Sequence, residues 1–146
     1  MSMNTIDADL GDYKPAKCAL WVTIGRATAG LKPWMLLIDA PTYTEKLMIH
    51  LVGSPTAYRV EKRFWTDYDE NRVEYWAYLG DIPNSDTVYD KIIQAGEGAE
   101  IDNDDPSYNC QDYILDVLEE LERLKIVSKR NSVYRENKWN LESKKE

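Results

Sequence analysis

Residues 105–121 have the sequence Asp-Pro-Ser-Tyr-Asn-Cys-Gln-Asp-Tyr-Ile-Leu-Asp-Val-Leu-Glu-Glu-Leu, which predicts the helix that organises the fold. Apolar residues recur in it at the spacing of one helical face: Ile114, Val117, Leu118 and Leu121. Asp105 is the expected N-cap, and Pro106 suits the first helical position because its missing N–H would be unpaired there anyway. Cys110 lies four residues before Ile114 and therefore shares the apolar face. The helix is expected to end near residues 125–127.

Five segments upstream of this helix are rich in strand-forming residues and separated by turn residues: 18–24, 34–38, 47–52, 58–65 and 73–79. Short connections between successive strands favour antiparallel pairing. Ser85 or Asp86 is expected to cap a short helix that Gly96 ends. The pattern predicts an α+β fold, in which an antiparallel sheet of about five strands packs on the cysteine-bearing helix.

The length of 146 residues predicts one domain. Residues 1–16 are expected to form a flexible lead-in, residues 17–127 the single domain, and residues 128–146 a polar, basic C-terminal tail. Turns are expected at residues 41–46 and 67–71, between the apolar segments.

Charge is unevenly distributed along the chain, which has a net charge of −8. Residues 97–122 contain ten acidic residues and no Lys or Arg, whereas residues 123–146 contain eight basic and three acidic residues. The two regions could be self-complementary, but a solvated helix face followed by a disordered tail is the simpler interpretation and the one we favour. The negative sign argues against nucleic acid as the main partner. The sequence leaves the oligomeric state open.

Nothing in the sequence predicts a membrane span or a secretory signal. No apolar run approaches the roughly 20 residues that cross a bilayer, and the first 12 residues are polar and acidic. Cys18 and Cys110 are therefore expected to be free thiols in a cytoplasmic protein.

A cysteine near a helix start suggests nucleophilic chemistry. The pKa of such a thiol can fall from about 8.5 to about 3.5–7.5, and the free backbone N–H groups can bind an oxyanion. The chain has one histidine, His50, which is the candidate base for Cys110. The alternative also stands: a cysteine on an apolar helix face is usually a core residue, and a strand histidine is usually packed.

No metal or cofactor is expected. Asp102, Asp104 and Asp105 lack the glycine and distal glutamate of a calcium loop, and one histidine with two distant cysteines does not make a zinc site. No phosphate-binding glycine loop is present. The strand aromatics, Trp21 and Trp34 among them, can line a pocket or fill the core, and the core is the more common role.

The block 101–127, with Asn109-Cys110-Gln111-Asp112-Tyr113 at its centre, resembles a group of uncharacterised fungal proteins that carry an Asn-Cys-Gln-Asp-aromatic signature. More distantly, it resembles the Asn-Cys-Glu-His-Phe signature of the lecithin:retinol acyltransferase-like family. That family belongs to the circularly permuted NlpC-like branch of papain-fold thiol enzymes. Residues 33–38 and 49–55 resemble the two paired strands of that family, so the resemblance spans roughly residues 18–127.

The resemblance implies a papain-like fold and a thiol-dependent acyltransferase or hydrolase acting on an amide or ester. Cys110 would be the nucleophile and His50 its partner. The residues implied at the substrate or oxyanion site are Asn109, Gln111, Trp34 and Trp21. The chain departs from the family at Pro33, which stands where the general base is expected. The alternatives are a catalytically silent papain-like scaffold that binds a small molecule or protein, or a pocket that catalyses a cyclisation or rearrangement without a thioester.

Overall fold

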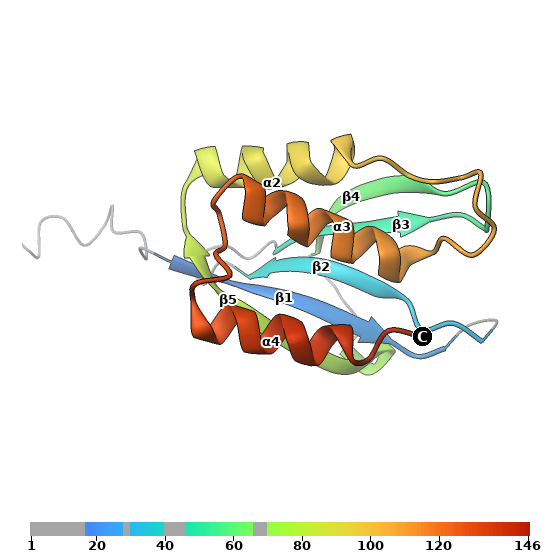
Figure 1. Ribbon diagram of the computed structural model, residues 1–146, viewed down its shortest axis with the longest axis horizontal. Coiled ribbons are helices and arrows are strands. Elements are labelled where there is room, and N and C mark those ends of the chain that lie inside the picture. Colours follow the sequence, from blue (N-terminus) through green and yellow to red (C-terminus); the bar gives the residue numbers. More distant parts are fainter. Residues whose placement is uncertain (1–16, 28–29, 40–45, 66–69) are drawn as a thin grey trace, which may run out of the picture.

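The computed structural model describes residues 17–27, 30–39, 46–65 and 70–146, apart from the side chain of Trp65 (Figure 1). These residues form a two-layer α+β domain, in which a sheet is covered on one face by helices. The expected lead-in at residues 1–16 and most of the two expected turns at 41–46 and 67–71 lie outside the described residues.

The predicted five-stranded antiparallel sheet is confirmed. Its strands are β1 (Lys17–Gly25), β2 (Trp34–Asp39), β3 (Lys46–Val52), β4 (Arg59–Trp65) and β5 (Val73–Pro83). They lie in the order β4-β3-β2-β1-β5, and each neighbouring pair is antiparallel. Since side chains alternate between faces along a strand, each strand contributes one set to the helical layer and one set to the opposite face.

Strand β5 continues past Gly80, where the sequence predicted its end. The register with β1 shifts between Leu20 and Trp21, opposite this glycine, and Gly80 has a φ of +147°. A glycine adopts this backbone at little cost, so the strand passes through a bulge and runs on to Pro83.

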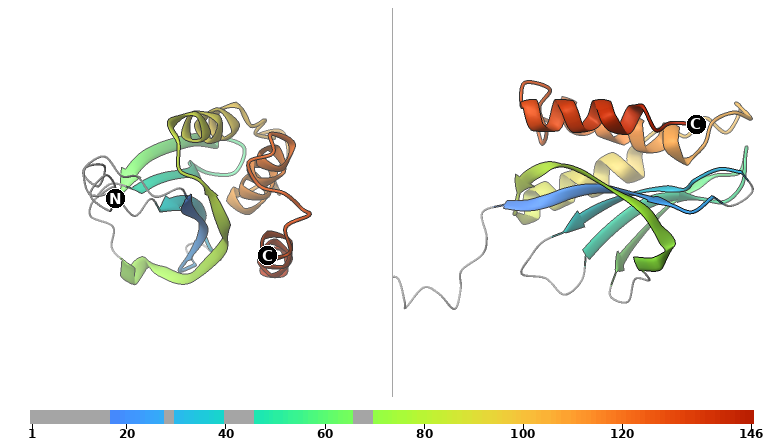
Figure 2. Two further views of the ribbon diagram at one scale, coloured as in Figure 1. Left: turned by 90° about the vertical axis from the view of Figure 1, so that its left-hand side faces the viewer. Right: turned by 90° about the horizontal axis from the view of Figure 1, so that it is seen from below.

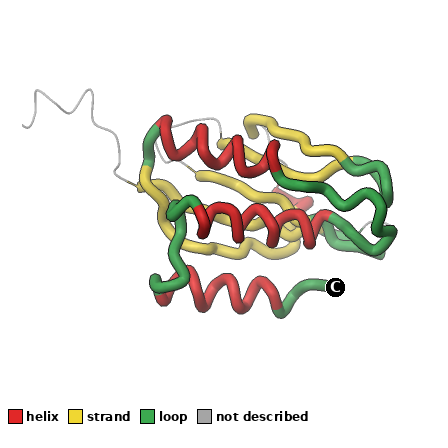
Figure 3. The backbone as a smooth tube through the Cα atoms, turned by 45° about the horizontal axis from the view of Figure 1, so that its top comes forward, coloured by secondary structure: helices red, strands yellow, loops and turns green. Residues whose placement is uncertain are grey.

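Three helices within the described residues lie side by side on one face of the sheet (Figures 1 and 3). They are α2 (Asp86–Gly98), α3 (Cys110–Arg123) and α4 (Ser132–Glu142). Helix α2 begins at the predicted cap, where the Ser85 hydroxyl accepts from Val88 N at 3.1 Å, but it ends two residues beyond Gly96. None of the helices in the described ranges is long and apolar enough to cross a bilayer.

Helix α3 starts at Cys110, so the predicted start at Asp105 and Pro106 is wrong. Asp105 instead closes a local turn, because its carboxylate accepts from Ser107 N at 2.8 Å and its carbonyl accepts from Tyr108 N at 3.1 Å. The N-cap is Asn109. The helix ends at Arg123, with Leu124 as its C-cap, slightly before the predicted end.

Residues 128–146 are not a disordered tail, because α4 forms within them. The self-complementary alternative describes them better, since Lys138 Nζ and Tyr134 Oη each lie 2.6 Å from Glu122 Oε2 of α3. Lys129 Nζ lies 3.4 Å from the other oxygen of Glu122. Charge complementarity within the chain therefore helps to dock α4 beside α3. On its sheet side α4 packs over β5 near Gly80.

The sheet carries a different apolar cluster on each face. The larger core lies between the sheet and the helices and includes Leu20, Leu36, Ile49, Leu79, Tyr113, Ile114 and Leu118, all fully buried. Each such side chain contributes about 1.5–3 kcal/mol by its burial, so this core holds α3 on the sheet. On the other face, Leu37, Met48 and Val73 form a smaller buried cluster. The sheet is curled, with the helices along its convex side and this second cluster on its concave side (Figure 2).

Candidate functional site

The signature around Cys110 builds the start of α3. Asn109 Oδ1 accepts hydrogen bonds from Gln111 N at 2.8 Å and from Asp112 N at 3.4 Å. Asp112 Oδ2 accepts in return from Asn109 N at 3.0 Å, which completes a capping box. Asn109 and Asp112 are thereby engaged in satisfying backbone groups of the helix.

The next signature residues connect α3 to the rest of the chain. Gln111 is fully buried, and its Nε2 donates to the Lys32 carbonyl at 3.0 Å while its Oε1 accepts from Glu146 N at 2.7 Å. The Tyr113 hydroxyl donates to the Gly96 carbonyl at 2.6 Å and so joins α3 to α2. The signature therefore has a structural role at each of these positions.

The Cys110 thiol is buried in the core, with 7% of the residue exposed. Burial raises its pKa above the usual value, while hydrogen bonding from the backbone of Trp34, Cys110 and Gln111 acts in the opposite direction. The thiol is thus protonated at neutral pH, and its Sγ lies 3.9 Å from the Lys32 carbonyl oxygen. Cys18 is also a free thiol and is buried in the core, and the sequence predicted both. Burial raises the pKa of this thiol as well.

His50 lies on the opposite face of the sheet from Cys110. Its strand neighbour Ile49 faces the helices, where a Cβ added to Gly96 would lie only 2.9 Å from Ile49 Cγ2. His50 therefore faces the concave side, where its Nε2 lies 2.7 Å from Glu61 Oε1. The described structure does not bring Cys110 and His50 together, and catalysis by this pair stays a hypothesis.

The other expected site residues are divided between the two faces. Trp34 lies in the helix-side core and is 1% exposed, and its indole N–H has no hydrogen-bond partner among the described residues. Trp21 lies on the concave face. Pro33 stands between Lys32 and Trp34, whose backbone groups contact Cys110, but its ring lies against Gly25 rather than against the thiol.

The concave face carries a group of side chains that the sequence reasoning did not bring together. Cross-strand pairing places Trp21 beside Tyr78 and Thr23 beside Trp76. The ring centroids of Trp21 and Trp76 are 6.2 Å apart in an edge-to-face arrangement, and those of Trp21 and Tyr78 are 5.1 Å apart. The period of two in β5 had predicted that Trp76 and Tyr78 share a face, but nothing local indicated that they would meet Trp21.

Thr23 lies in the middle of this group and is fully buried. Its hydroxyl has no hydrogen-bond partner among the described residues. A buried polar group without a partner is uncommon in proteins, which makes this hydroxyl a candidate contact for a bound molecule. Its cross-strand neighbour on the other side is Met35, which in turn pairs with His50.

The edges of the concave face are polar. The Tyr78 hydroxyl donates to Asp81 Oδ1 at 2.8 Å, and its burial together with this carboxylate raises the pKa of Tyr78 to about 12. At the other edge the hydrogen bond from His50 lowers the pKa of Glu61. The face therefore combines an apolar centre with hydrogen-bonding groups at both sides, as small-molecule sites commonly do.

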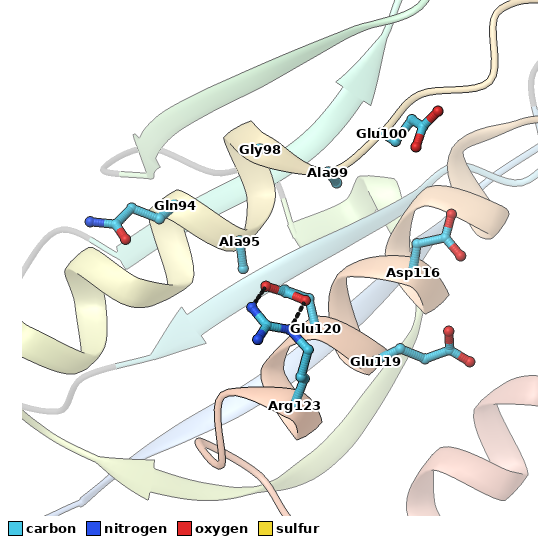
Figure 4. Close-up of a pocket in the computed structure, with 9 residues that line it drawn as sticks. All are labelled: Gln94, Ala95, Gly98, Ala99, Glu100, Asp116, Glu119, Glu120 and Arg123. Carbon is cyan, nitrogen blue, oxygen red and sulfur yellow. Dashed lines mark hydrogen bonds and ion pairs between the residues drawn. The ribbon is translucent and has the colours of Figure 1, made fainter.

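Two open grooves lie on the helical side. One, of about 550 Å³ between α2 and α3, is bordered by Glu100, Asp116, Glu119 and Glu120 around a floor of Ala95 and Gly98 (Figure 4). The other, of about 700 Å³, lies where α3 ends and is bordered by Lys125, Lys129 and Arg130. In the first groove Arg123 is bound by both oxygens of Glu120 at 2.8 and 2.6 Å, so its charge is already matched. Neither groove contains Cys110 or His50.

No group of three or more potential metal ligands occurs among the described residues. Comparison with known proteins found no matching family model, no matching curated protein and no matching solved structure. The geometry of the chain itself is therefore the basis for a functional proposal.

Proposed function

We propose that this protein binds a small, flat, aromatic molecule on the concave face of its sheet. The observation that carries the proposal is the cluster of Trp21, Trp76 and Tyr78 rings beside the partnerless hydroxyl of Thr23. Trp76 keeps 38% of its surface exposed, and α2, α3 and α4 all lie on the other face of the sheet (Figure 2). Aromatic rings so arranged offer a large contact area at little cost in side-chain entropy.

The ligand expected here is uncharged and carries one hydrogen-bonding group. Leu37 and Met48 give the face an apolar floor, which favours a ring system over an ion. Thr23 is fully buried, so a ligand hydroxyl or carbonyl contacts it only by entering between the neighbouring side chains, and that contact would give a partner to a hydroxyl that otherwise lacks one. That contact would distinguish a hydroxylated ring from a plain hydrocarbon of the same shape.

A papain-like scaffold without its general base is consistent with this proposal, and we propose it as the finer description of the fold. The backbone of Lys32 and Trp34 flanks the Cys110 thiol, and the intervening Pro33 stands where the family resemblance expects the base, with its ring against Gly25. A proline cannot accept a proton from a thiol, and the raised pKa of Cys110 leaves that thiol protonated. Binding therefore accounts for the geometry better than acyl transfer through Cys110.

The test is a titration with 2-naphthol and with naphthalene, followed by tryptophan fluorescence and calorimetry. We expect both to bind, with 2-naphthol bound more tightly. The variant Trp76→Leu should weaken both ligands by about tenfold, because it removes an aromatic wall of the site. Trp139→Leu is the matched control, since Trp139 is 73% exposed on α4 in the other layer and its loss should leave both affinities unchanged.

A second variant tests the polar contact. Thr23→Val keeps the shape of the side chain and removes the hydroxyl, so it should abolish the preference for 2-naphthol over naphthalene. Equal affinities of the wild type and Trp76→Leu for both ligands would refute the site. An undiminished preference in Thr23→Val would refute the role of the hydroxyl alone.

A further inference from the structure

Residues 144–146 lie against the start of α3, on the side of the sheet opposite to the proposed ligand site. Lys144 Nζ lies 4.2 Å from the centre of the Tyr75 ring, which is a cation–π contact. Lys145 Nζ lies 3.0 Å from Asp112 Oδ1. Both cationic side chains of the segment therefore have a partner of complementary character.

The last residue of the segment is held through its backbone as well as its side chain. Glu146 N donates to Gln111 Oε1 at 2.7 Å, and Glu146 Oε1 accepts from Lys32 N at 3.2 Å. Gln111 itself is fixed by burial and by its hydrogen bond to the Lys32 carbonyl. A rigidly held side-chain amide can accept a hydrogen bond from the main-chain N–H of any peptide that follows the same path. This contact is therefore not specific to residues 144–146.

We propose that the surface formed by Lys32, Tyr75, Gln111 and Asp112, named here the strap site, is a peptide-docking site that residues 144–146 occupy in cis. Its ligand class is a short peptide with two adjacent cationic side chains followed by a carboxylate, which in the occupying segment come directly after a turn at the end of α4. The Tyr75 ring contacts the first cation, and the Asp112 carboxylate pairs with the second. Gln111 and the Lys32 N–H together bind the residue that carries the carboxylate.

The occupying segment is held weakly enough to exchange. The side chains of Lys145 and Asp112 are 37% and 27% exposed, and ion pairs so open to water contribute little. Because the segment is tethered, however, its effective concentration at the site is of the order of mM. A peptide of the same chemistry added in solution is therefore excluded from the intact protein and binds when the tethered segment is weakened.

The Cys110 thiol reports on occupancy. It is the residue before Gln111, and its Sγ contacts the same Lys32 carbonyl that Gln111 binds. Loss of the tethered segment removes the contact of Glu146 with Gln111 and raises the solvent exposure of the Cys110 thiol. The rate of Cys110 alkylation is therefore a second readout, independent of any measurement of peptide affinity.

The experiment compares the intact protein with the full-length variant Lys144→Ala/Lys145→Ala/Glu146→Ala. The probe is a fluorescein-labelled peptide of residues 141–146, Leu-Glu-Ser-Lys-Lys-Glu, followed by fluorescence anisotropy. We expect the variant to bind it at least about tenfold more tightly than the intact protein does and to alkylate faster at Cys110. The same peptide with both lysines replaced by norleucine should bind neither protein.

Two further substitutions in the background of the triple variant assign the contact. Asp112→Asn removes the charge that Lys145 meets but keeps an oxygen for the cap, so it should weaken the peptide by severalfold. Glu119→Gln removes the same charge from an exposed position about two turns further along α3, and it should leave peptide affinity unchanged. If the triple variant does not fold, as judged by circular dichroism, the single variant Lys145→Gln replaces it. Equal peptide binding and equal alkylation rates in the intact and altered proteins would overturn the proposal.

Discussion

Cys110 and His50 lie on opposite faces of the sheet: the thiol is packed in the helix-side core, and the imidazole is paired with Glu61 on the concave side. The two residues are the natural candidates for a nucleophile and its base, and the intervening sheet separates them. The burial that raises the pKa of the Cys110 thiol also removes it from solvent. This relationship is the main reason for placing function elsewhere on the molecule.

The first prediction concerns thiol reactivity in the intact chain. Cys110 should stay slow to alkylate at about pH 6–8, because a buried thiol with a raised pKa is protonated there. Alkylation with iodoacetamide in the variant Cys18→Ala, followed by mass spectrometry, measures the rate. The further change His50→Ala should leave it unchanged. A thiol that reacts near pH 6 and loses that reactivity in His50→Ala would restore the catalytic pair.

The second prediction tests whether Pro33 occupies the position of a missing base. The Pro33 ring lies against Gly25, away from the helix-side core that holds Trp34 and Cys110, so the imidazole of Pro33→His should lie there too and leave the alkylation rate of Cys110 and its pH midpoint unchanged. Pro33→Ala is the control, because it removes the ring without supplying a base. A faster alkylation rate or a lower pH midpoint in Pro33→His than in Pro33→Ala would show that position 33 can supply a base to the thiol.

The third prediction concerns the cap of α3. Asn109→Ala should lower the free energy of unfolding by about 1 kcal/mol, because it leaves the N–H groups of Gln111 and Asp112 without their acceptor. Asn109→Ser should recover most of the loss, since its hydroxyl can cap the same helix. Urea denaturation measures both. No loss in Asn109→Ala would mean that the asparagine is retained for a reason other than capping.

The fourth prediction concerns the charge network between α3 and α4. Lys138→Met should destabilise the protein by about 3 kcal/mol, because Glu122 would remain buried without its main cation. Lys129→Met is the matched control. Lys129 also contacts Glu122 but is 70% exposed, and its loss should cost less than about 1 kcal/mol. Similar losses in the two variants would show that burial does not set the strength of this network.

The same network has a pH signature. Burial alone would raise the pKa of Glu122, but the hydrogen bonds from Lys138 and Tyr134 outweigh it and the pKa is lowered. A carboxyl with a lowered folded-state pKa stabilises the protein above its unfolded pKa of about 4.3, and this contribution is lost as the pH falls through the folded value. Lowering the pH should therefore reduce the difference in the free energy of unfolding between the wild type and Lys138→Met.

The fifth prediction concerns alkaline stability. Burial raises the pKa values of seven cysteine and tyrosine side chains: Cys18, Cys110, Tyr58, Tyr78, Tyr108, Tyr113 and Tyr134. The unfolded chain releases these protons from about pH 8.5 for cysteine and about pH 10 for tyrosine, whereas the folded chain keeps them to higher pH. Above these values the unfolded state binds fewer protons, so the free energy of unfolding falls as the pH rises. Thermal unfolding between about pH 7.5 and 10.5 measures the slope.

Cys110→Ala provides the comparison for this measurement. It removes one of the seven groups and should make the decline of the free energy of unfolding with pH shallower. A melting temperature that does not change between neutral and alkaline pH would show that the buried groups titrate as they do in the unfolded chain.

Much of the fold followed from local pattern. All five strands were predicted within a few residues, because strand-forming runs are separated by turn residues. The apolar face of α3 was predicted from the spacing of Ile114, Val117 and Leu118, all of which are fully buried. The helix start was wrong because Asp105 and Asn109 are both good caps, and only the reciprocal bond from Asp112 favours the second.

The sequence already indicated which face of the sheet His50 occupies. Leu47, Ile49 and Leu51 form the more apolar side of β3, and the more apolar side of a half-covered strand is the one that meets the helices. This signal places His50 away from Cys110. Cys110 and His50 have the chemistry of a nucleophile and its base, but the alternation of side chains along β3 puts them on different faces.

The sequence by itself determined the five strands and the helices α2 and α3 along the chain, the apolar face of α3 and the residues that share each face of a strand, because these depend on spacing along the chain. Only the tertiary structure decided that Trp21 meets Trp76 and Tyr78, that the hydroxyl of Thr23 has no partner among the described residues, and that Gln111 binds residues 32 and 146 at once. Those contacts join segments far apart in the chain, and they depend on strand register and helix docking, which many distant side chains set together.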